Sequence, residues 1–164
     1  MDAELKKAFQ KQQTIRQKFR RYWPNYLWQT GLAALLIVVV AIVAQGESRV
    51  VIASMGSTAF ICFALPKSYS AQTRNVIGGH LVALMCGGLL TITGWPFYLE
   101  FPIAAGLAMF LMVALDTEHA PAVGTALAVT MHEVDWAIAL AIMLAVLLMS
   151  QARYILRHHL KDLV

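Results

Sequence analysis

The spacing of the charged residues constrains this chain more than any other feature. Only nine of its 22 Asp, Glu, Lys and Arg side chains lie between residues 22 and 152, and each interrupts apolar sequence. A chain with 59% hydrophobic and 13% charged residues does not have the composition of a water-facing surface. We therefore predict an integral membrane protein. The nine charged residues are Glu47, Arg49, Lys67, Arg74, Glu100, Asp116, Glu118, Glu133 and Asp135.

These charges divide the chain into six apolar stretches: residues 22–46, 50–66, 75–99, 101–115, 119–132 and 136–152. A helix needs about 20 residues to cross a hydrocarbon core of about 30 Å. The first and third stretches meet this length, the second, fourth and sixth are short but workable, and the fifth is the shortest and most polar. The expected fold is all-α: a polytopic bundle of membrane helices with two short middle helices.

The basic residues indicate the orientation, because cytoplasmic loops are enriched in Lys and Arg. If all six stretches cross from a cytoplasmic N-terminus, twelve of the thirteen basic residues lie inside and only Arg49 lies outside. Treating the second or the fifth stretch as re-entrant destroys this bias. We predict six crossings with both termini in the cytoplasm, in a bacterial inner membrane.

The six stretches also form two sets of three, each with a short middle member rich in small residues. Residues 56–59 read Gly-Ser-Thr-Ala, and residues 124–126 read Gly-Thr-Ala. Three crossings per set invert the second set, and inverted repeats with short helices at matching positions point to a transport site near the midplane. Because the echo is only a few small residues, a chance match is an equal alternative to a 3+3 inverted repeat.

Three segments are expected along the chain. Residues 1–25 are typical of a basic amphipathic helix on an anionic membrane surface, ended by Pro24. A solvated basic arm that only fixes the topology is an equal alternative. Residues 26–156 form the transmembrane domain, and residues 157–164 form a basic cytoplasmic tail.

Polar residues at the start of the third stretch mark one part of a candidate site. Arg74 and Asn75 lie at its cytoplasmic mouth, where a guanidinium suits a small oxyanion, although a positive-inside anchor explains Arg74 equally well. His80 lies about one and a half turns farther in, and an ionisable residue inside a span faces a cavity or a partner. A structural hydrogen bond to a neighbouring helix explains His80 equally well. Small residues on the same helix predict close packing against a neighbour: Gly79, Ala83 and Gly87.

The start of the fifth stretch marks the other part. Pro121 suits the first turn of a helix, whose free backbone N–H groups hold anions, and His119 lies just ahead of it. The carboxylates of Asp116 and Glu118 repel an anion unless they are paired or protonated. A carboxylate beside a histidine also suits a proton relay.

Two motifs, RNVIGGH at residues 74–80 and EHAPAVGTAL at residues 118–127, resemble the HPP family of integral membrane proteins. The resemblance covers about residues 27–149. The His-Pro-Pro motif that names the family reads His119-Ala120-Pro121 here, and Thr73 stands where the family's proline is expected. Family members of plastids and cyanobacteria are associated with nitrite transport, which the resemblance implies as a substrate class. The family is often described with four spans, against the six expected here.

The leading hypothesis is a transporter or channel for a small monovalent anion such as nitrite, and not an enzyme. No cofactor, metal or nucleic-acid partner is expected. Anionic lipid headgroups and further copies of the chain are the expected partners, since an oligomer shelters short helices. The predicted substrate-binding residues are Ser57, Thr58, Arg74, Asn75, His80, His119, Pro121, Gly124 and Thr125.

Two other classes are kept as alternatives. A membrane scaffold or sensor would use the basic N-terminal helix to bind a partner. A membrane metalloenzyme would use some of five ligand-type residues, but the sequence has no HxxxH or HExxH spacing to support it. Those five are His80, Glu118, His119, His132 and Glu133. Cys62 and Cys86 fit no disulfide or zinc pattern and are expected to be small core residues.

Overall fold

The computed structural model describes the backbone of residues 3–43, 49–131 and 136–163. Within these ranges the chain forms helices and no strand, which confirms the expected all-α class. The elements are α1 (Ala3–Val43), α2 (Arg49–Ala64), the 3₁₀ turn η1 (Tyr69–Ala71), α3 (Thr73–Thr91), α4 (Phe97–Ala114), α5 (Ala122–Met131) and α6 (Trp136–Leu156).

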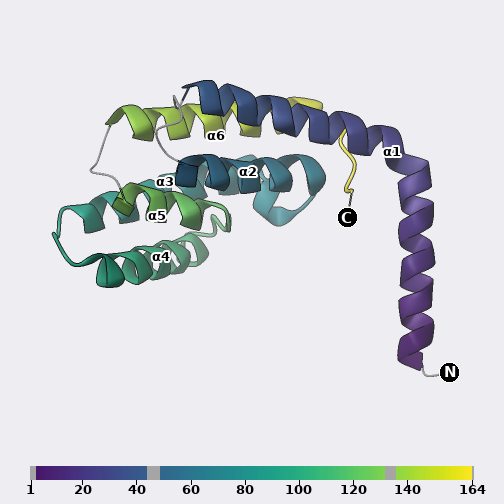
Figure 1. Ribbon diagram of the computed structural model, residues 1–164, viewed down its shortest axis with the longest axis horizontal. Helices are drawn as coiled ribbons and strands as arrows, with labels where there is room; N and C mark the ends of the chain where they lie inside the picture. Colours follow the sequence, from purple (N-terminus) through teal and green to yellow (C-terminus); the bar gives the residue numbers. More distant parts are fainter. Residues whose placement is uncertain (1–2, 44–48, 132–135, 164) are drawn as a thin grey trace.

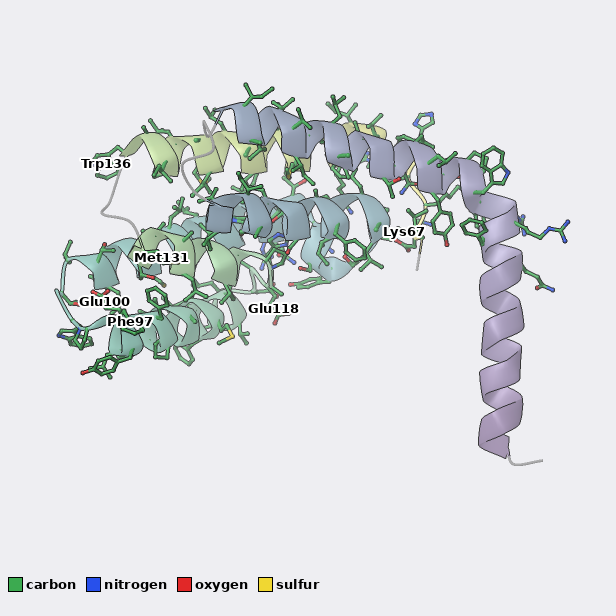
Figure 2. The ribbon with its side chains drawn as sticks, in the orientation of Figure 1. Lys67, Phe97, Glu100, Glu118, Met131 and Trp136 are labelled. Atoms are coloured by element: carbon green, nitrogen blue, oxygen red, sulfur yellow. The ribbon has the colours of Figure 1, made fainter. Side chains whose placement is uncertain are left out.

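Successive helices run in alternate directions from the bend in α1 to the end of α6 (Figure 1). Figure 1 shows α1 and α6 along one side of the bundle, α4 and α5 along the opposite side, and α2 and α3 between them. We call the end with residues 65–72, 115–121 and the C-terminal tail the loop end. The opposite end, which we call the turn end, carries Phe97, Met131 and Trp136 (Figure 2).

Three helices are long and apolar enough to cross a membrane within the described ranges: Phe19–Ile42, Phe97–Ala114 and Trp136–Leu156. The sequence reading ranked the third stretch above the fourth and sixth, and this ranking was wrong. Helix α3 has 19 residues but carries Arg74, Asn75 and His80 in its first turns, which lowers its hydropathy. Two shorter apolar helices, Val50–Ala64 and Ala122–Met131, match the predicted short members.

Helix α1 passes through Pro24 without ending, contrary to the expectation that Pro24 ends it. A proline inside a helix removes one backbone hydrogen bond and clashes with the preceding turn, so it bends the helix instead. Figure 1 shows this consequence: the N-terminal part of α1 projects away from the bundle, and the remainder lies against it.

The turn between α3 and α4 falls inside the third predicted stretch and moves its boundary. Gly94 takes a left-handed backbone conformation (φ 64°), and Pro96 caps the start of α4. Glu100, expected between two stretches, lies instead in the first turn of α4. It is buried, and the Thr93 hydroxyl donates to its carboxylate. The charge is therefore part of the turn end and does not separate two helices.

Two apolar clusters form the interior. The first is contributed mainly by α1, α2 and α6, with Met55, Phe63 and Met149 fully buried. The second is contributed by α3, α4 and α5, and includes Ala83 and Ala126. Helix α5 packs against α2, α3 and α4, which places a helix of only ten residues inside the bundle. At about 1.5 Å per residue it covers about half of a hydrocarbon core.

The small residues of α3 bring it close to α5, as the sequence predicted. A Cβ atom added at Gly87 would lie 2.6 Å from the Ala126 carbonyl oxygen and 2.9 Å from Val129 Cβ. Ala83 is completely buried in the same interface. Because any side chain at Gly87 would meet backbone, this glycine sets the separation of the two helices.

The C-terminal tail is fixed to the loop end by polar contacts with α1. The buried Gln29 side chain donates to the carbonyl oxygens of Phe63 and Lys161, and its Oε1 accepts from the Lys161 N–H at 3.1 Å. Leu163 N–H donates to the Ala64 carbonyl at 2.9 Å. The tail thus closes the loop end over the middle of α1 and the end of α2.

Candidate functional site

Helix α2 presents two hydroxyls to the interior, at positions four residues apart and hence on one helix face. Thr58 is fully buried and donates to the Ser54 carbonyl, 3.0 Å away on its own helix. Ser54 is also buried, and its hydroxyl donates to the carbonyl oxygen of Pro121 at 2.8 Å. These contacts attach α2 to the start of α5.

Two histidines from different segments meet at Thr58. His80, from α3, and His119, from the segment before α5, are 0% and 1% exposed. Their Nε2 atoms lie 3.0 Å and 3.2 Å from Thr58 Oγ1. The two rings are 5.2 Å apart between centroids and are tilted by 52°. A single threonine hydroxyl therefore lies within hydrogen-bonding distance of both imidazoles.

The far side of each ring also has a partner. His80 Nδ1 lies 2.9 Å from Thr125 Oγ1, which in turn lies 3.0 Å from Ser54 Oγ. His119 Nδ1 lies 2.7 Å from the Ser70 carbonyl oxygen and 3.2 Å from the Ser70 hydroxyl. We call the continuous set of contacts the polar chain; from one end to the other it runs through Ser70, His119, Thr58, His80, Thr125, Ser54 and Pro121.

Glycines of α3 make room for the segment that carries His119. A Cβ atom added at Gly79 would lie 2.8 Å from His119 Cβ and 3.0 Å from the Thr117 carbonyl oxygen. One added at Gly78 would lie 2.7 Å from Thr117 Cγ2. The glycine pair of the first sequence motif thus lets a non-helical segment approach α3 closely enough for the two histidines to share Thr58.

Arg74 lies at the mouth of the site and is already paired. Its guanidinium donates to the Asp116 carboxylate and to the Asp116 carbonyl, and the Tyr69 hydroxyl donates to the same carboxylate. These side chains are exposed. The hydrogen bond from Tyr69, followed by that from Arg74, holds the pKa of Asp116 below its ordinary value. The hydrogen bond between Tyr69 and Asp116 also raises the pKa of Tyr69.

Asn75 lies behind this pair and is buried. Its amide nitrogen donates to the Tyr69 carbonyl at 2.8 Å, which ties η1 to the first turn of α3. Its buried Oδ1 has no hydrogen-bond partner among the described residues. Three nearby buried hydroxyls also have no hydrogen-bond partner among the described residues: those of Ser68, Thr73 and Thr117.

The start of α5 differs from the sequence expectation. Pro121 lies one residue before the helix, and the first N–H groups donate to loop carbonyls: Ala122 to His119, Val123 to Ala120, and Gly124 to Pro121. These three donors are not free to hold an anion, because a tight turn already satisfies them. Gly124 instead allows contact with α2, since a Cβ there would lie 3.3 Å from Ser54 Cβ.

The predicted residues therefore divide into three groups. Thr58, His80, His119 and Thr125 are brought together in the polar chain, and Pro121 and Gly124 support it through Ser54. Arg74 and Asn75 line the mouth. The exposed Ser57 donates to the carbonyl of Ala53 and lies outside the polar chain.

Sequence reasoning missed Ser54 and Ser70. The four-residue spacing between Ser54 and Thr58 could have identified the first, because it places both on the face that Thr58 uses. The metalloenzyme alternative gains no support: the described residues hold no group of three or more His, Cys, Asp or Glu placed to bind a metal. His132 and Glu133, which that alternative also invoked, lie outside the described residues.

Comparison with known proteins agrees with the two motifs. The HPP transmembrane region matches residues 19–159. The chain belongs to the HPP family. A transmembrane protein of Dictyostelium discoideum is 30% identical to this HPP-family chain over 102 residues, which cover 60% of the chain and 36% of that relative. The chain thus spans about a third of the length of the relative it matches. No solved structure matches it.

The two motifs that resemble the HPP family contribute residues to the polar chain and to its mouth. Residues 74–80 contribute Arg74, Asn75 and His80, and residues 118–127 contribute His119 and Thr125. The two motifs are far apart in sequence, and the fold joins them at Thr58, a residue from neither.

Proposed function

We propose that this HPP-family protein transports a small monovalent anion, nitrite or one of similar size, across a membrane along the polar chain. One observation carries the proposal: two histidines and three hydroxyls are buried together between α2, α3 and α5 of a membrane protein. Buried polar groups are costly in a membrane, and ionisable ones mark ion pathways. Imidazole and hydroxyl groups both donate to an oxyanion.

The mouth supports the same proposal. A planar guanidinium binds carboxylates and small oxyanions in the same way, so the Asp116 carboxylate occupies the part of Arg74 that an arriving anion would use. Exchange of Asp116 for the anion is the first step. The buried hydroxyls of Thr73 and Thr117, which have no hydrogen-bond partner among the described residues, then offer the next donors.

Beyond the mouth, the anion reaches Thr58 and the histidine pair. The turn that commits the first N–H groups of α5 opens during this step, since those donors are otherwise satisfied. The match to the HPP transmembrane region gives no support to the alternative function, a metalloenzyme.

The remaining expectations about the membrane belong to the same proposal. The loop end faces the cytoplasm of a bacterium, both termini lie on that side, and α2 and α5 complete six crossings as the middle members of two inverted sets. Large exposed apolar side chains on α4 and α6 face lipid or further copies of the chain, among them Phe110, Val113, Leu140 and Leu144. An oligomer would shelter the short helices.

The test is uptake of nitrite by proteoliposomes that contain the purified protein, with protein-free vesicles as the background. We expect protein-dependent uptake that His119→Ala and Arg74→Ala reduce at least tenfold and about threefold, since the first removes a member of the polar chain and the second removes a mouth contact. Thr130→Val is the matched control, because within the described residues the Thr130 hydroxyl donates to its own helix, at Leu127. Wild-type uptake in both test variants would refute these assignments.

A second candidate function, a scaffold or sensor, is favoured by one observation. The N-terminal part of α1 projects away from the bundle, where it is free to meet a partner or a membrane surface (Figure 1). Its sequence is rich in Lys and Arg. Deletion of residues 1–21 separates the two candidates: a scaffold loses its cellular function with this segment, whereas nitrite uptake by the bundle continues.

A further inference from the structure

The polar chain contains more hydrogen-bond contacts than its neutral members have protons to supply. Both ends are carbonyl oxygens, of Ser70 and of Pro121, which only accept. Between them stand five groups, and each carries one hydrogen-bonding proton when the histidines are neutral. Five groups between two acceptors make six contacts, and the contact of Thr58 with the Ser54 carbonyl is a seventh. The five are His119, Thr58, His80, Thr125 and Ser54.

The two carbonyl ends determine which contact of the polar chain lacks a proton. Ser54 donates to Pro121, so Thr125 donates to Ser54 and His80 Nδ1–H donates to Thr125. At the other end His119 Nδ1–H donates to the Ser70 carbonyl. Each neutral ring then turns an Nε2 lone pair toward Thr58. The Thr58 hydroxyl has one proton for these two lone pairs and for the Ser54 carbonyl oxygen, which accepts it when both rings are neutral.

One added proton completes the six contacts of the polar chain when the Thr58 hydroxyl turns from the Ser54 carbonyl to His80. If it binds Nε2 of His119, that N–H donates to Thr58 Oγ1, and the Thr58 hydroxyl donates to Nε2 of His80. If Thr58 passes its own proton to His80 and takes the one from His119, the charge moves from ring to ring with no net gain or loss of protons. The threonine hydroxyl is therefore a relay between the two binding positions, Nε2 of His80 and Nε2 of His119.

A charged histidine pair needs a counter-ion here, because a buried charge without one is costly. Within the described residues no carboxylate hydrogen-bonds either ring. The ionisable groups of the surrounding segments lie elsewhere. Arg74, Asp116 and Tyr69 hydrogen-bond one another, Glu118 is exposed, and Glu100 lies at the turn end. Arg153 donates to the Pro66 carbonyl, and Cys62 and Cys86 are buried free thiols. The transported anion supplies the missing negative charge.

We infer that His80 and His119 form a proton-binding site that shares one proton through Thr58, and that proton and anion bind together and cross as a neutral pair. The inference rests on the proposed anion transport and adds its coupling ion. The neutral site lacks the charge to attract an anion, and the protonated site lacks a counter-ion until the anion arrives. Each ligand therefore raises the affinity for the other.

Proteoliposomes loaded with a pH-sensitive dye test this inference with nitrite as the probe and formate and chloride as comparators. Protein-free vesicles give the background from diffusion of the free acid. We expect one proton to enter with each nitrite above that background. A membrane potential of either sign should change the rate less than twofold, and a gradient of one pH unit, acid outside, should drive accumulation up to about tenfold.

Variants at Thr58 test the relay. Thr58→Val removes the hydroxyl and should lower proton-coupled uptake at least tenfold, whereas Thr58→Ser keeps the hydroxyl and should retain the stoichiometry of one. Thr130→Val should behave as the wild type. Uptake that follows the membrane potential and carries no proton would overturn the inference and leave anion transport intact. Absence of protein-dependent uptake of all three anions would overturn both.

Discussion

The imidazole rings of His80 and His119, which come from segments 39 positions apart in sequence, lie 5.2 Å apart and both direct Nε2 at the hydroxyl of Thr58. This relationship depends on three features of the fold. Helix α2 presents Thr58 inward, Gly79 lets the His119 segment lie on α3, and Ser70 holds the outer side of His119. The first prediction below alters the surroundings of the pair without changing either ring.

Gly79→Ala should displace His119. The new Cβ would lie 2.8 Å from His119 Cβ and 3.0 Å from a backbone oxygen, so the segment has to shift away from Thr58. We expect overpacking to cost about 1–3 kcal/mol of stability and nitrite uptake to fall at least tenfold. Thermal unfolding in detergent and uptake by proteoliposomes measure the two effects.

The matched control for this change is Gly88→Ala on the same helix, where a Cβ would have no neighbour within 4 Å. It should leave uptake unchanged and raise stability by up to about 1 kcal/mol, because alanine is the better helix former. Equal behaviour of the two variants would contradict the role assigned to the α3 glycines.

Asp116→Asn should increase the apparent affinity for nitrite. The Asp116 carboxylate competes with the anion for the Arg74 guanidinium, and an amide competes less well. Asparagine also tolerates the left-handed backbone of this position (φ 56°), so the loop should keep its shape. We expect the KM of uptake to fall about two- to fivefold; a KM that rises by this factor would mean that the carboxylate helps to bind the substrate.

The pH dependence of transport should not arise at the mouth. Because the folded-state pKa of Asp116 is lowered from 3.8, the pairing with Arg74 and Tyr69 is present above that ordinary value and is lost only as the pH falls through the still lower folded-state pKa. Between about pH 5 and 8, where histidines titrate, the pair is unchanged. The uptake profiles of the wild type and Asp116→Asn should therefore have the same shape; a flat profile in the variant would assign the dependence to Asp116.

Gln29→Leu should release the C-terminal tail while transport continues. From a buried position the side chain hydrogen-bonds Phe63 and Lys161, and the loss of these bonds leaves the carbonyl groups of both residues without this partner. We expect a loss of about 1–3 kcal/mol in stability and faster proteolysis of residues 157–163. Thr30→Val, at an exposed position bonded only to its own helix, should change neither. Protection equal to the wild type would show that the tail is held by other contacts.

The sequence indicated the members of the site better than their arrangement. His80, His119, Thr58 and Thr125 are polar groups within apolar stretches, and the bilayer makes such residues conspicuous. Ser57 and Thr58 are adjacent in sequence, but successive helix positions point about 100° apart, so only one of them reaches the interior. Composition cannot choose between them, because the choice depends on how α2 is rotated against α3 and α5.

The mouth and the helix boundaries were less accessible from the sequence. The pairing of Arg74 with Asp116 joins α3 to the segment before α5, and no local pattern indicates a contact between residues 42 positions apart. Likewise, Glu100 resembles a boundary charge until the turn at Gly94 and Pro96 places it inside α4. Tertiary packing decides both, whereas charge spacing alone was sufficient for the all-helical membrane class.

Nitrite uptake by Thr58→Val, compared with Thr130→Val and the wild type at equal protein content, tests the central claim most directly. Both substitutions replace a threonine hydroxyl by a methyl group of the same shape, but only Thr58 joins the two histidines. The polar chain predicts at least a tenfold loss of uptake in Thr58→Val and wild-type uptake in Thr130→Val. Wild-type uptake by Thr58→Val would contradict transport along this path.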